Sequence, residues 1–192
     1  MKRNSHLLLA SLVIALGAGA AHGKECEGVS FPDEAKVGES TLKLNGLGLR
    51  QATMFKVDVY VAALYVAQTS KDANAILKSS APKELILHFV RDVGSSDLNK
   101  GWQEGFENNA RSELPALKDR IESFKGLMTD VKKGDELRLL HKPGAGVQVE
   151  VNKAVKGTIK GDDFAHALFS IWLGANPPNA GLKAGLLGGA CG

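Results

Sequence analysis

One arginine stands directly ahead of the most apolar stretch of the chain. Arg50 ends the segment Asn45-Gly-Leu-Gly-Leu-Arg50, and the run Phe55–Val66 then alternates as a strand does. An unpaired buried charge costs several kcal/mol, so an arginine that enters a core needs an anion. Its guanidinium presents two parallel donors that match a carboxylate. Tyr60 and Lys56 fall on one face of the expected strand and could complete an anion-binding site.

Arg50 and Tyr60 also have ordinary structural explanations. Arg50 could be a surface arginine at a turn, since charged residues are mostly exposed. Tyr60 could be one of the aromatic residues that strands favour. Both explanations stand beside the anion site as alternatives.

Other common chemistries find little support in the sequence. The pair Gly46-x-Gly48 lacks the third glycine of a nucleotide-binding loop, and a strand follows it instead of a helix. Beyond residue 23 the histidines are His88, His141 and His166, none of which is spaced with a second metal ligand. No serine elbow or catalytic triad is recognisable. We therefore expect neither a metal nor an organic cofactor.

The first 23 residues predict a secretory signal. Lys2 and Arg3 precede the apolar run 7–16, and small residues then lead to a cleavage site at about Gly23. The run is short of the roughly 20 residues that span a bilayer, which makes an uncleaved anchor the weaker alternative. We expect export through an inner membrane to the periplasm, no membrane span after cleavage, and one domain over residues 24–192.

The nearly neutral net charge of the mature chain and its two cysteines are consistent with an exported protein. The chain has a formal net charge of +3, but without Lys2 and Arg3 only 22 basic residues face 21 acidic ones, which gives no electrostatic case for nucleic acid. Cys26 and Cys191 form an even pair near the two ends of the mature chain, and in an oxidising compartment such a pair predicts a disulfide. Two separate thiols are the alternative.

The expected elements alternate between strands and helices. Strands are expected at 40–44, 55–66, 84–91, 136–141, 146–151 and 155–159. Helices are expected at 70–78, 95–111, 115–124, 164–173 and 182–187. Asn45-Gly46 is a turn signal between the first two strands, and Ser70 is a candidate helix cap. The order predicts an α+β fold with a curved antiparallel sheet and helices on one face.

The chain resembles the chalcone isomerase family in these stretches, in particular its bacterial exported chalcone isomerase-like branch. The matching stretches are Asn45–Arg50, Phe55–Tyr65, Arg91–Val93, Trp102–Phe106, Gly161–Ala165 and Ser170–Gly174. The resemblance implies an open-faced β-sandwich in which a large antiparallel sheet and a layer of helices enclose a ligand cleft.

The resemblance also implies a role for Arg50. In the plant enzymes the matching arginine binds and polarises a substrate while a phenol adds across an enone, and in fatty-acid-binding members it grips a carboxylate together with a tyrosine on the next strand. Tyr60 stands where the plant enzymes have a water-holding threonine, Leu98 near their catalytic tyrosine and Gly105 near their substrate-binding asparagine. No match to their distal threonine precedes Ile159.

The sequence therefore predicts an exported, non-catalytic protein that binds a fatty acid or a similar apolar carboxylate. Arg50 is the expected anion clamp, Tyr60 its hydrogen-bonding companion, and the helix Leu98–Phe106 with the sheet is expected to line the tail. The alternative is an isomerase, an intramolecular lyase acting on a chalcone-like enone, in which Arg50 would be catalytic by stabilising enolate charge. A structural protein with a vestigial cleft is a third possibility.

Overall fold

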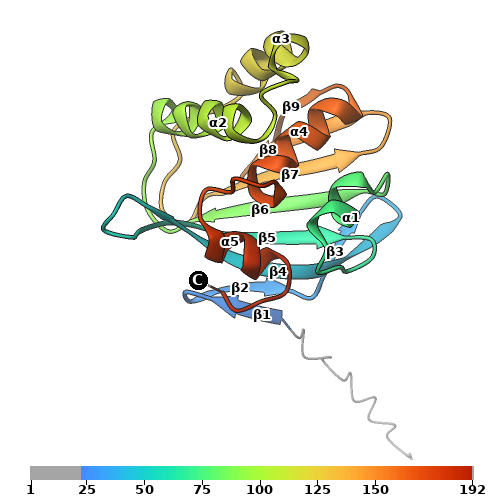
Figure 1. The fold of residues 1–192 in the computed structure, drawn as a ribbon. Coiled ribbons are helices and arrows are strands. Elements are labelled where there is room, and N and C mark those ends of the chain that lie inside the picture. The colour runs from blue at the N-terminus through green and yellow to red at the C-terminus, as the bar shows by residue number, and fades with distance from the viewer. Residues whose placement is uncertain (1–22, 192) are drawn as a thin grey trace, which may run out of the picture.

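A seven-stranded antiparallel sheet is the centre of the fold, described for residues 23–191 by a computed structural model (Figure 1). Its strand order follows the chain, because each strand pairs with the next one in sequence. The strands are β3 (Glu34–Val37), β4 (Ser40–Ala52), β5 (Val57–Val66), β6 (Lys83–Phe89), β7 (Glu136–Lys142), β8 (Gly146–Val151) and β9 (Ala154–Ile159). The predicted signal, apart from Gly23, lies outside the described residues.

The helices cover one face of this sheet, and a small hairpin packs against the other (Figure 1). The helices are α1 (Ala73–Lys78), α2 (Ser95–Asn109), α3 (Leu114–Lys125), α4 (Asp162–Leu173) and α5 (Ala180–Leu186). The hairpin consists of β1 (Gly23–Cys26) and β2 (Val29–Pro32). The predicted α+β architecture, with an antiparallel sheet and helices on one face, is confirmed. Within residues 23–191 no helix is long and apolar enough to cross a membrane.

Strand β5 shows why the sheet is apolar on both sides. Tyr60, Ala62 and Leu64 pack into the core beneath the helices, whereas Val61 and Tyr65 pack into a second core with Phe31 of the hairpin. Residues that alternate along a strand point to opposite faces, so each face of β5 meets its own covering layer.

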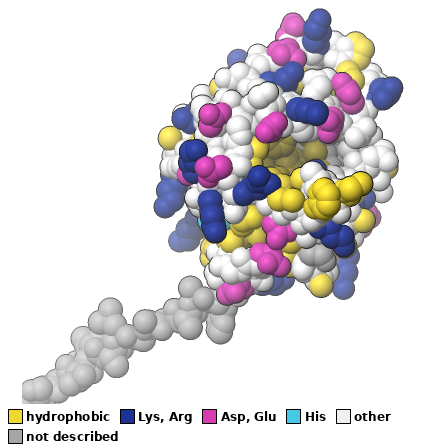
Figure 2. Space-filling view, turned by 90° about the vertical axis from the view of Figure 1, so that its left-hand side faces the viewer, with side chains coloured by type: hydrophobic (Ala, Val, Ile, Leu, Met, Phe, Trp, Pro, Cys, Tyr) yellow, Lys and Arg dark blue, Asp and Glu magenta, His cyan; other side chains and the backbone are white. Residues whose placement is uncertain are grey.

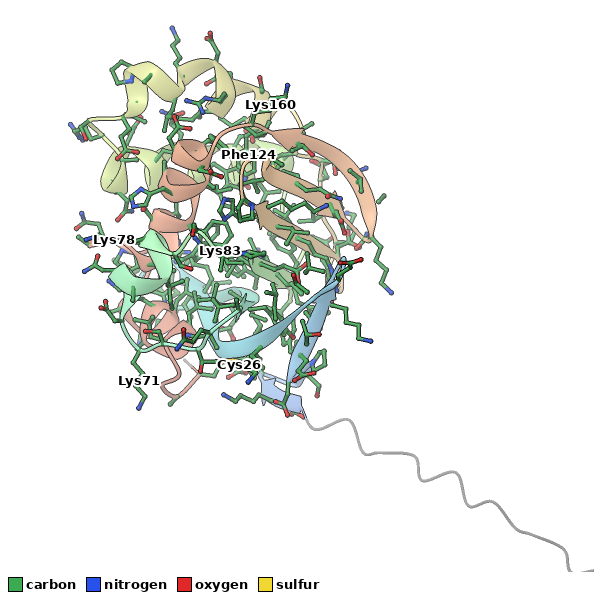
Figure 3. All side chains as sticks on the ribbon, turned by 90° about the vertical axis from the view of Figure 1, so that its right-hand side faces the viewer. Cys26, Lys71, Lys78, Lys83, Phe124 and Lys160 are labelled. Atoms are coloured by element: carbon green, nitrogen blue, oxygen red, sulfur yellow. A yellow bond between two sulfur atoms is a disulfide. The ribbon has the colours of Figure 1, made fainter. Side chains whose placement is uncertain are left out.

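Aromatic side chains fill the core under the helices. Phe124 of α3 points inward (Figure 3) and lies 5.4 Å from Trp102, 6.4 Å from Phe106 and 5.8 Å from Phe164 between ring centroids. These spacings are typical of edge-to-face or tilted aromatic packing. Phe106 is fully buried in this cluster, so it stabilises the attachment of α2 and α3 to α4.

The expected turn at Asn45-Gly46 is wrong. Strand β4 runs through this position, and its pairing with β5 shifts between Leu44 and Gly46 as in a β-bulge. The Asn45 side chain is buried, donates to the carbonyl oxygens of Ser70 (3.0 Å) and Leu186 (2.7 Å), and accepts from the Ser70 amide (2.8 Å). Asn45 is therefore a buried link to two distant segments.

The glycines that follow Asn45 let helix α5 approach the sheet. A Cβ atom at Gly46 would overlap the carbonyl oxygen of Gly185, and one at Gly48 would overlap that of Leu182. The two glycines of the Gly-x-Gly pattern thus allow close backbone packing of α5 on β4. They do not form a nucleotide-binding loop.

Two smaller predictions also need correction. Ser70 is not the cap of α1, because the side chain of Asp72 accepts the hydrogen bond from the Asn74 amide at 2.8 Å. The strand after Arg50 begins at Val57, since Lys56 still belongs to the turn and has a φ of 49°.

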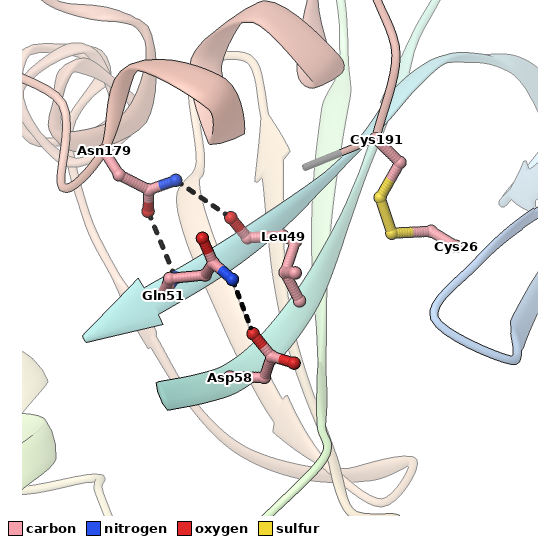
Figure 4. Close-up of a disulfide and its surroundings, with 6 residues drawn as sticks. All are labelled: Cys26, Leu49, Gln51, Asp58, Asn179 and Cys191. Carbon is pink, nitrogen blue, oxygen red and sulfur yellow. Dashed lines mark hydrogen bonds between the residues drawn. A yellow bond between two sulfur atoms is a disulfide. The ribbon is translucent and has the colours of Figure 1, made fainter. Parts of the chain in front are cut away.

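Cys26 and Cys191 are joined by a disulfide (Figure 4). Their Cα atoms are 5.9 Å apart although the residues are separated by 165 positions in sequence. The bridge ties the β1–β2 hairpin to the segment that follows α5.

Candidate ligand-binding site

Arg50 and Tyr60 are direct cross-strand partners on β4 and β5. Residues opposite each other in an antiparallel pair share one face of the sheet, with Cβ atoms roughly 5 Å apart. Tyr60 packs on the helix side, so Arg50 also lies on that side. Arg50 is half-buried and Tyr60 is buried.

The pair lines an open cavity of about 630 Å³ at one end of the sheet. Helix α2 forms one wall, and the turn after β6, part of α4 and the segment 176–178 form the rest. The apolar lining consists of Ala52, Val59, Val93, Leu98, Trp102, Ile171, Pro177 and Pro178, and charged residues of the lining include Arg91, Asp92, Asp97, Lys100 and Glu104. Figure 2 shows a hollow on this side of the molecule, with hydrophobic atoms inside it and charged side chains around it.

The Tyr60 hydroxyl is held as a neutral donor. Its oxygen accepts a hydrogen bond from Nε1 of Trp172 at 3.0 Å. Burial raises the pKa of Tyr60 to about 12, against the opposing effects of Trp172 and of the positive charge on Arg50. Because the oxygen already accepts from Trp172, its own proton is available for an acceptor in the cavity.

Arg50 has no carboxylate partner at salt-bridge distance within the described part of the chain. Its Nη1 donates to the carbonyl oxygen of Gln51. The nearby carboxylate of Asp58 instead accepts from Nε2 of Gln51 at 2.9 Å (Figure 4). The guanidinium therefore brings a positive charge to the cavity that no protein anion neutralises at close range.

Trp102, which belongs to the same cavity as the Arg50–Tyr60 pair, has a buried hydrogen-bond donor. It is buried, lines the cavity, and its Nε1 has no hydrogen-bond partner among the residues described. A buried donor without a partner costs about 1–3 kcal/mol. The Trp102 and Trp172 rings pack edge to face with centroids 5.6 Å apart, so Trp102 contacts the tryptophan that donates to Tyr60.

The structure brings two of the three predicted binding residues together and sets the third apart. Lys56 is exposed in the turn between β4 and β5 and is not part of the cavity lining. Leu98 and Gly105, which the resemblance puts near the catalytic tyrosine and the substrate-binding asparagine of the plant enzymes, do line the cavity. Phe106 does not line it, because it points into the aromatic core.

Sequence reasoning missed both tryptophans as site residues and overlooked Arg91. The sequence predicts only that Trp102 and Trp172 lie in helices, and nothing in their spacing reveals which indole nitrogen meets Tyr60. Arg91 could have been noticed, because it follows an apolar strand much as Arg50 precedes one. No group of three or more histidine, cysteine, aspartate or glutamate residues within positions 23–191 is arranged to hold a metal.

Comparison with known proteins identifies the family of the chain and a solved structure with a similar fold. A family model described as chalcone isomerase-like matches residues 23–188. Among solved structures, the crystal structure of a fatty-acid binding protein from Arabidopsis thaliana is similar with a TM-score of 0.64. That similarity covers 83% of this chain and 92% of the other at 17% sequence identity, a level at which the likeness shows the fold. No match was found among curated proteins.

Proposed function

The chain belongs to the chalcone isomerase-like family, and we propose that it is a non-catalytic binding protein for a fatty acid or a similar apolar carboxylate. The observation that carries this proposal is the pairing of Arg50 with Tyr60 in a cavity whose lining is otherwise rich in apolar side chains. A carboxylate would accept from the Arg50 guanidinium and from the Tyr60 hydroxyl, whose proton is not needed by Trp172.

The cavity has room for an apolar tail. Its volume of about 630 Å³ falls within the range of small-molecule sites, about 300–1,000 Å³. Val59, Leu98 and Ile171 offer apolar contacts beside the polar pair. The similar Arabidopsis thaliana structure is of a fatty-acid binding protein, which supports this ligand class by analogy of fold.

The cavity is poorly equipped for acid–base catalysis near neutral pH. The resemblance puts Leu98 near the catalytic tyrosine of the plant enzymes and Gly105 near their substrate-binding asparagine, and neither Leu98 nor Gly105 can exchange a proton. A general base works best with a pKa near the working pH, whereas that of Tyr60 is raised to about 12. If the chain were an enone isomerase instead, wild-type protein would convert chalcones faster than buffer does, and Arg50→Ala would abolish the difference.

We place the protein outside the inner membrane, in the periplasm. The support is the basic and apolar start of the sequence, together with the Cys26–Cys191 disulfide, which is typical of an oxidising compartment. Cell fractionation of the full chain, compared with a chain whose apolar run 7–16 is interrupted by charges, tests this placement.

Calorimetric titration with long-chain fatty acids tests the proposed ligand. Arg50→Ala should weaken binding at least about tenfold, since a hydrogen-bonded charge contributes about 1.5–3 kcal/mol. Arg111→Ala is the matched control, because it also removes one arginine charge but Arg111 is exposed and does not line the cavity. Absence of binding to wild-type protein, or equal binding by wild type and Arg50→Ala, would contradict the proposal.

A further inference from the structure

Two large apolar side chains stand exposed at the tip of the β4–β5 hairpin. Met54 is 87% exposed and Phe55 is 82% exposed. Val155, at 59%, is the other large apolar residue exposed within the described chain, and it lies on β9. Neither Met54 nor Phe55 belongs to either hydrophobic core. Their exposure therefore has no explanation in the packing of the fold.

The backbone of the tip is organised without these side chains. The Lys56 amide donates to the Thr53 carbonyl oxygen at 3.2 Å, and the Phe55 amide donates to the Thr53 hydroxyl at 3.3 Å. Both Thr53 and Lys56 adopt positive φ angles, 64° and 49°. Met54 and Phe55 between them have no such angles, and small polar residues would suit these two turn positions at least as well. The choice of methionine and phenylalanine at its apex thus points to a contact outside the molecule.

The tip stands beside the mouth of the cavity. Ala52 and Thr53, at the base of the turn, line the cavity together with Arg50. The hairpin projects from the same side of the molecule as the start of α2 (Figure 1), and Figure 2 shows exposed hydrophobic atoms next to the hollow. Whatever binds the tip would therefore lie close to the opening through which a ligand enters.

The size and charge of this surface fit a lipid surface. Two such side chains offer roughly 300 Å², well below the about 800 Å² that each partner buries in a stable protein complex. Exposed aromatic and apolar residues next to basic ones are typical of segments that lie in the membrane interface. Lys56 is part of the tip, and Arg91 and Lys100 are exposed at the mouth.

Acidic residues at the mouth offset this basic charge only in part. Asp92 accepts from Nζ of Lys132 at 3.0 Å and from the Lys133 amide at 2.9 Å, so the Asp92–Lys132 pair adds no net charge to this surface. Among the other residues of the lining and the hairpin, the basic Arg50, Lys56, Arg91 and Lys100 outnumber the acidic Asp58, Asp97 and Glu104 by one. The resulting basic surplus favours an anionic surface.

We propose that the hairpin tip Thr53–Lys56 docks on an anionic lipid surface, with Met54 and Phe55 in the interface and the cavity mouth held against the lipid. Docking itself depends only on the tip. Its use for exchange of a fatty acid between membrane and cavity rests on the function proposed above. An amphipathic ligand could then pass between bilayer and cavity with little exposure of its tail to water.

Tryptophan fluorescence tests the docking directly. The two native tryptophans are buried, so a tryptophan introduced by Phe55→Trp reports on the tip, and Val155→Trp is the matched control on another surface. With vesicles of phosphatidylcholine and phosphatidylglycerol, emission from the Phe55→Trp chain should shift to the blue and be quenched by brominated lipid. Emission from the Val155→Trp chain should do neither. Equal responses of the two chains, or none from Phe55→Trp, would overturn the proposal.

Vesicle sedimentation of the mature chain, without the predicted signal, supplies a second measurement. The double variant Met54→Ser, Phe55→Ser should bind the anionic vesicles about tenfold or more weakly than wild-type protein. Val155→Ser should leave this binding unchanged. Lys56→Glu should weaken binding to anionic vesicles and have little effect on vesicles of phosphatidylcholine alone. Unchanged binding by the double variant would overturn the proposal.

Titration without vesicles separates docking from ligand binding. The Met54→Ser, Phe55→Ser variant should bind a fatty acid in solution as wild-type protein does. If it has instead lost that affinity, the tip closes over the cavity and the docking proposal is wrong. If wild-type protein binds no fatty acid while the tip still inserts into vesicles, docking is supported and the function proposed above fails.

Discussion

Nε1 of Trp172 donates a hydrogen bond to the Tyr60 hydroxyl at 3.0 Å, which joins α4 to β5 inside the buried core next to the cavity. This contact fixes which group donates and which accepts. The indole can only donate, so the phenol oxygen accepts and the phenol proton remains for another partner. Because Arg50 lies opposite Tyr60, that proton and the guanidinium can act on one ligand group.

Tyr60→Phe should therefore weaken both the fold and the proposed binding. Nε1 of Trp172 would lose its acceptor in a buried place, which costs about 1–3 kcal/mol. Affinity for a fatty acid should fall about tenfold with the loss of one donor to a charged group. Urea unfolding and calorimetry measure the two effects.

Tyr65→Phe is the matched control for that variant. The Tyr65 hydroxyl donates to the Pro32 carbonyl oxygen at 2.8 Å on the opposite face of the sheet. Its removal should also cost stability but leave fatty-acid affinity unchanged. Equal losses of affinity in Tyr60→Phe and Tyr65→Phe would show that unfolding, and not a lost ligand contact, explains the change.

Stability should decrease on the alkaline side. Burial raises the pKa of Tyr60 from 10.0 to about 12 and raises that of Tyr65 as well. Between pH 10 and 12 the unfolded chain loses the Tyr60 proton while the folded chain keeps it, so the free energy of unfolding falls as pH rises. Tyr60 alone contributes a loss of about 2–3 kcal/mol over this window.

Ultraviolet titration measures this effect, since Tyr60 and Tyr65 are the two tyrosines of the chain. In folded Tyr65→Phe protein, the remaining phenolate signal should appear well above pH 10. A midpoint near 10 while the protein is still folded would contradict the burial of the Tyr60 hydroxyl.

Gly48→Ala should destabilise the packing of α5 on β4. The added methyl group would overlap the Leu182 carbonyl oxygen and approach its Cδ1 at 2.9 Å, and overpacking of this kind costs about 1–3 kcal/mol. At Gly101 in α2 nothing lies within 4 Å of the new atom, so Gly101→Ala should raise stability by about 1 kcal/mol. Thermal unfolding compares the two, and a neutral Gly48→Ala would contradict the close approach.

Many strands and helices could be predicted because the spacing of apolar residues within a short segment indicates its secondary structure. The alternation in Val57–Val66 and the stripe Leu98, Trp102 and Phe106 specify a strand and a helix whatever they pack against. The meander β7–β8–β9 was recognisable because turn residues separate its strands.

The errors arose where a distant segment decides the structure. Asn45-Gly46 carries the residues of a turn, yet its conformation depends on a hydrogen bond to Leu186, 141 positions away, and on the backbone of Gly185. Lys56 was assigned to a strand face because the alternation was counted two residues into the turn. The pairing of Arg50 with Tyr60 also depends on register shifts on both sides, which no spacing in the sequence reveals.

The contact between Arg50 and a ligand carboxylate is tested most directly by a cycle of two proteins and two ligands. Wild type and Arg50→Ala are each titrated with a fatty acid and with the fatty alcohol of the same chain length. We expect wild-type protein to bind the acid at least about tenfold more tightly than the alcohol, and Arg50→Ala to bind the two with nearly equal affinity. The same preference for the acid in both proteins, or none in wild-type protein, would contradict the account.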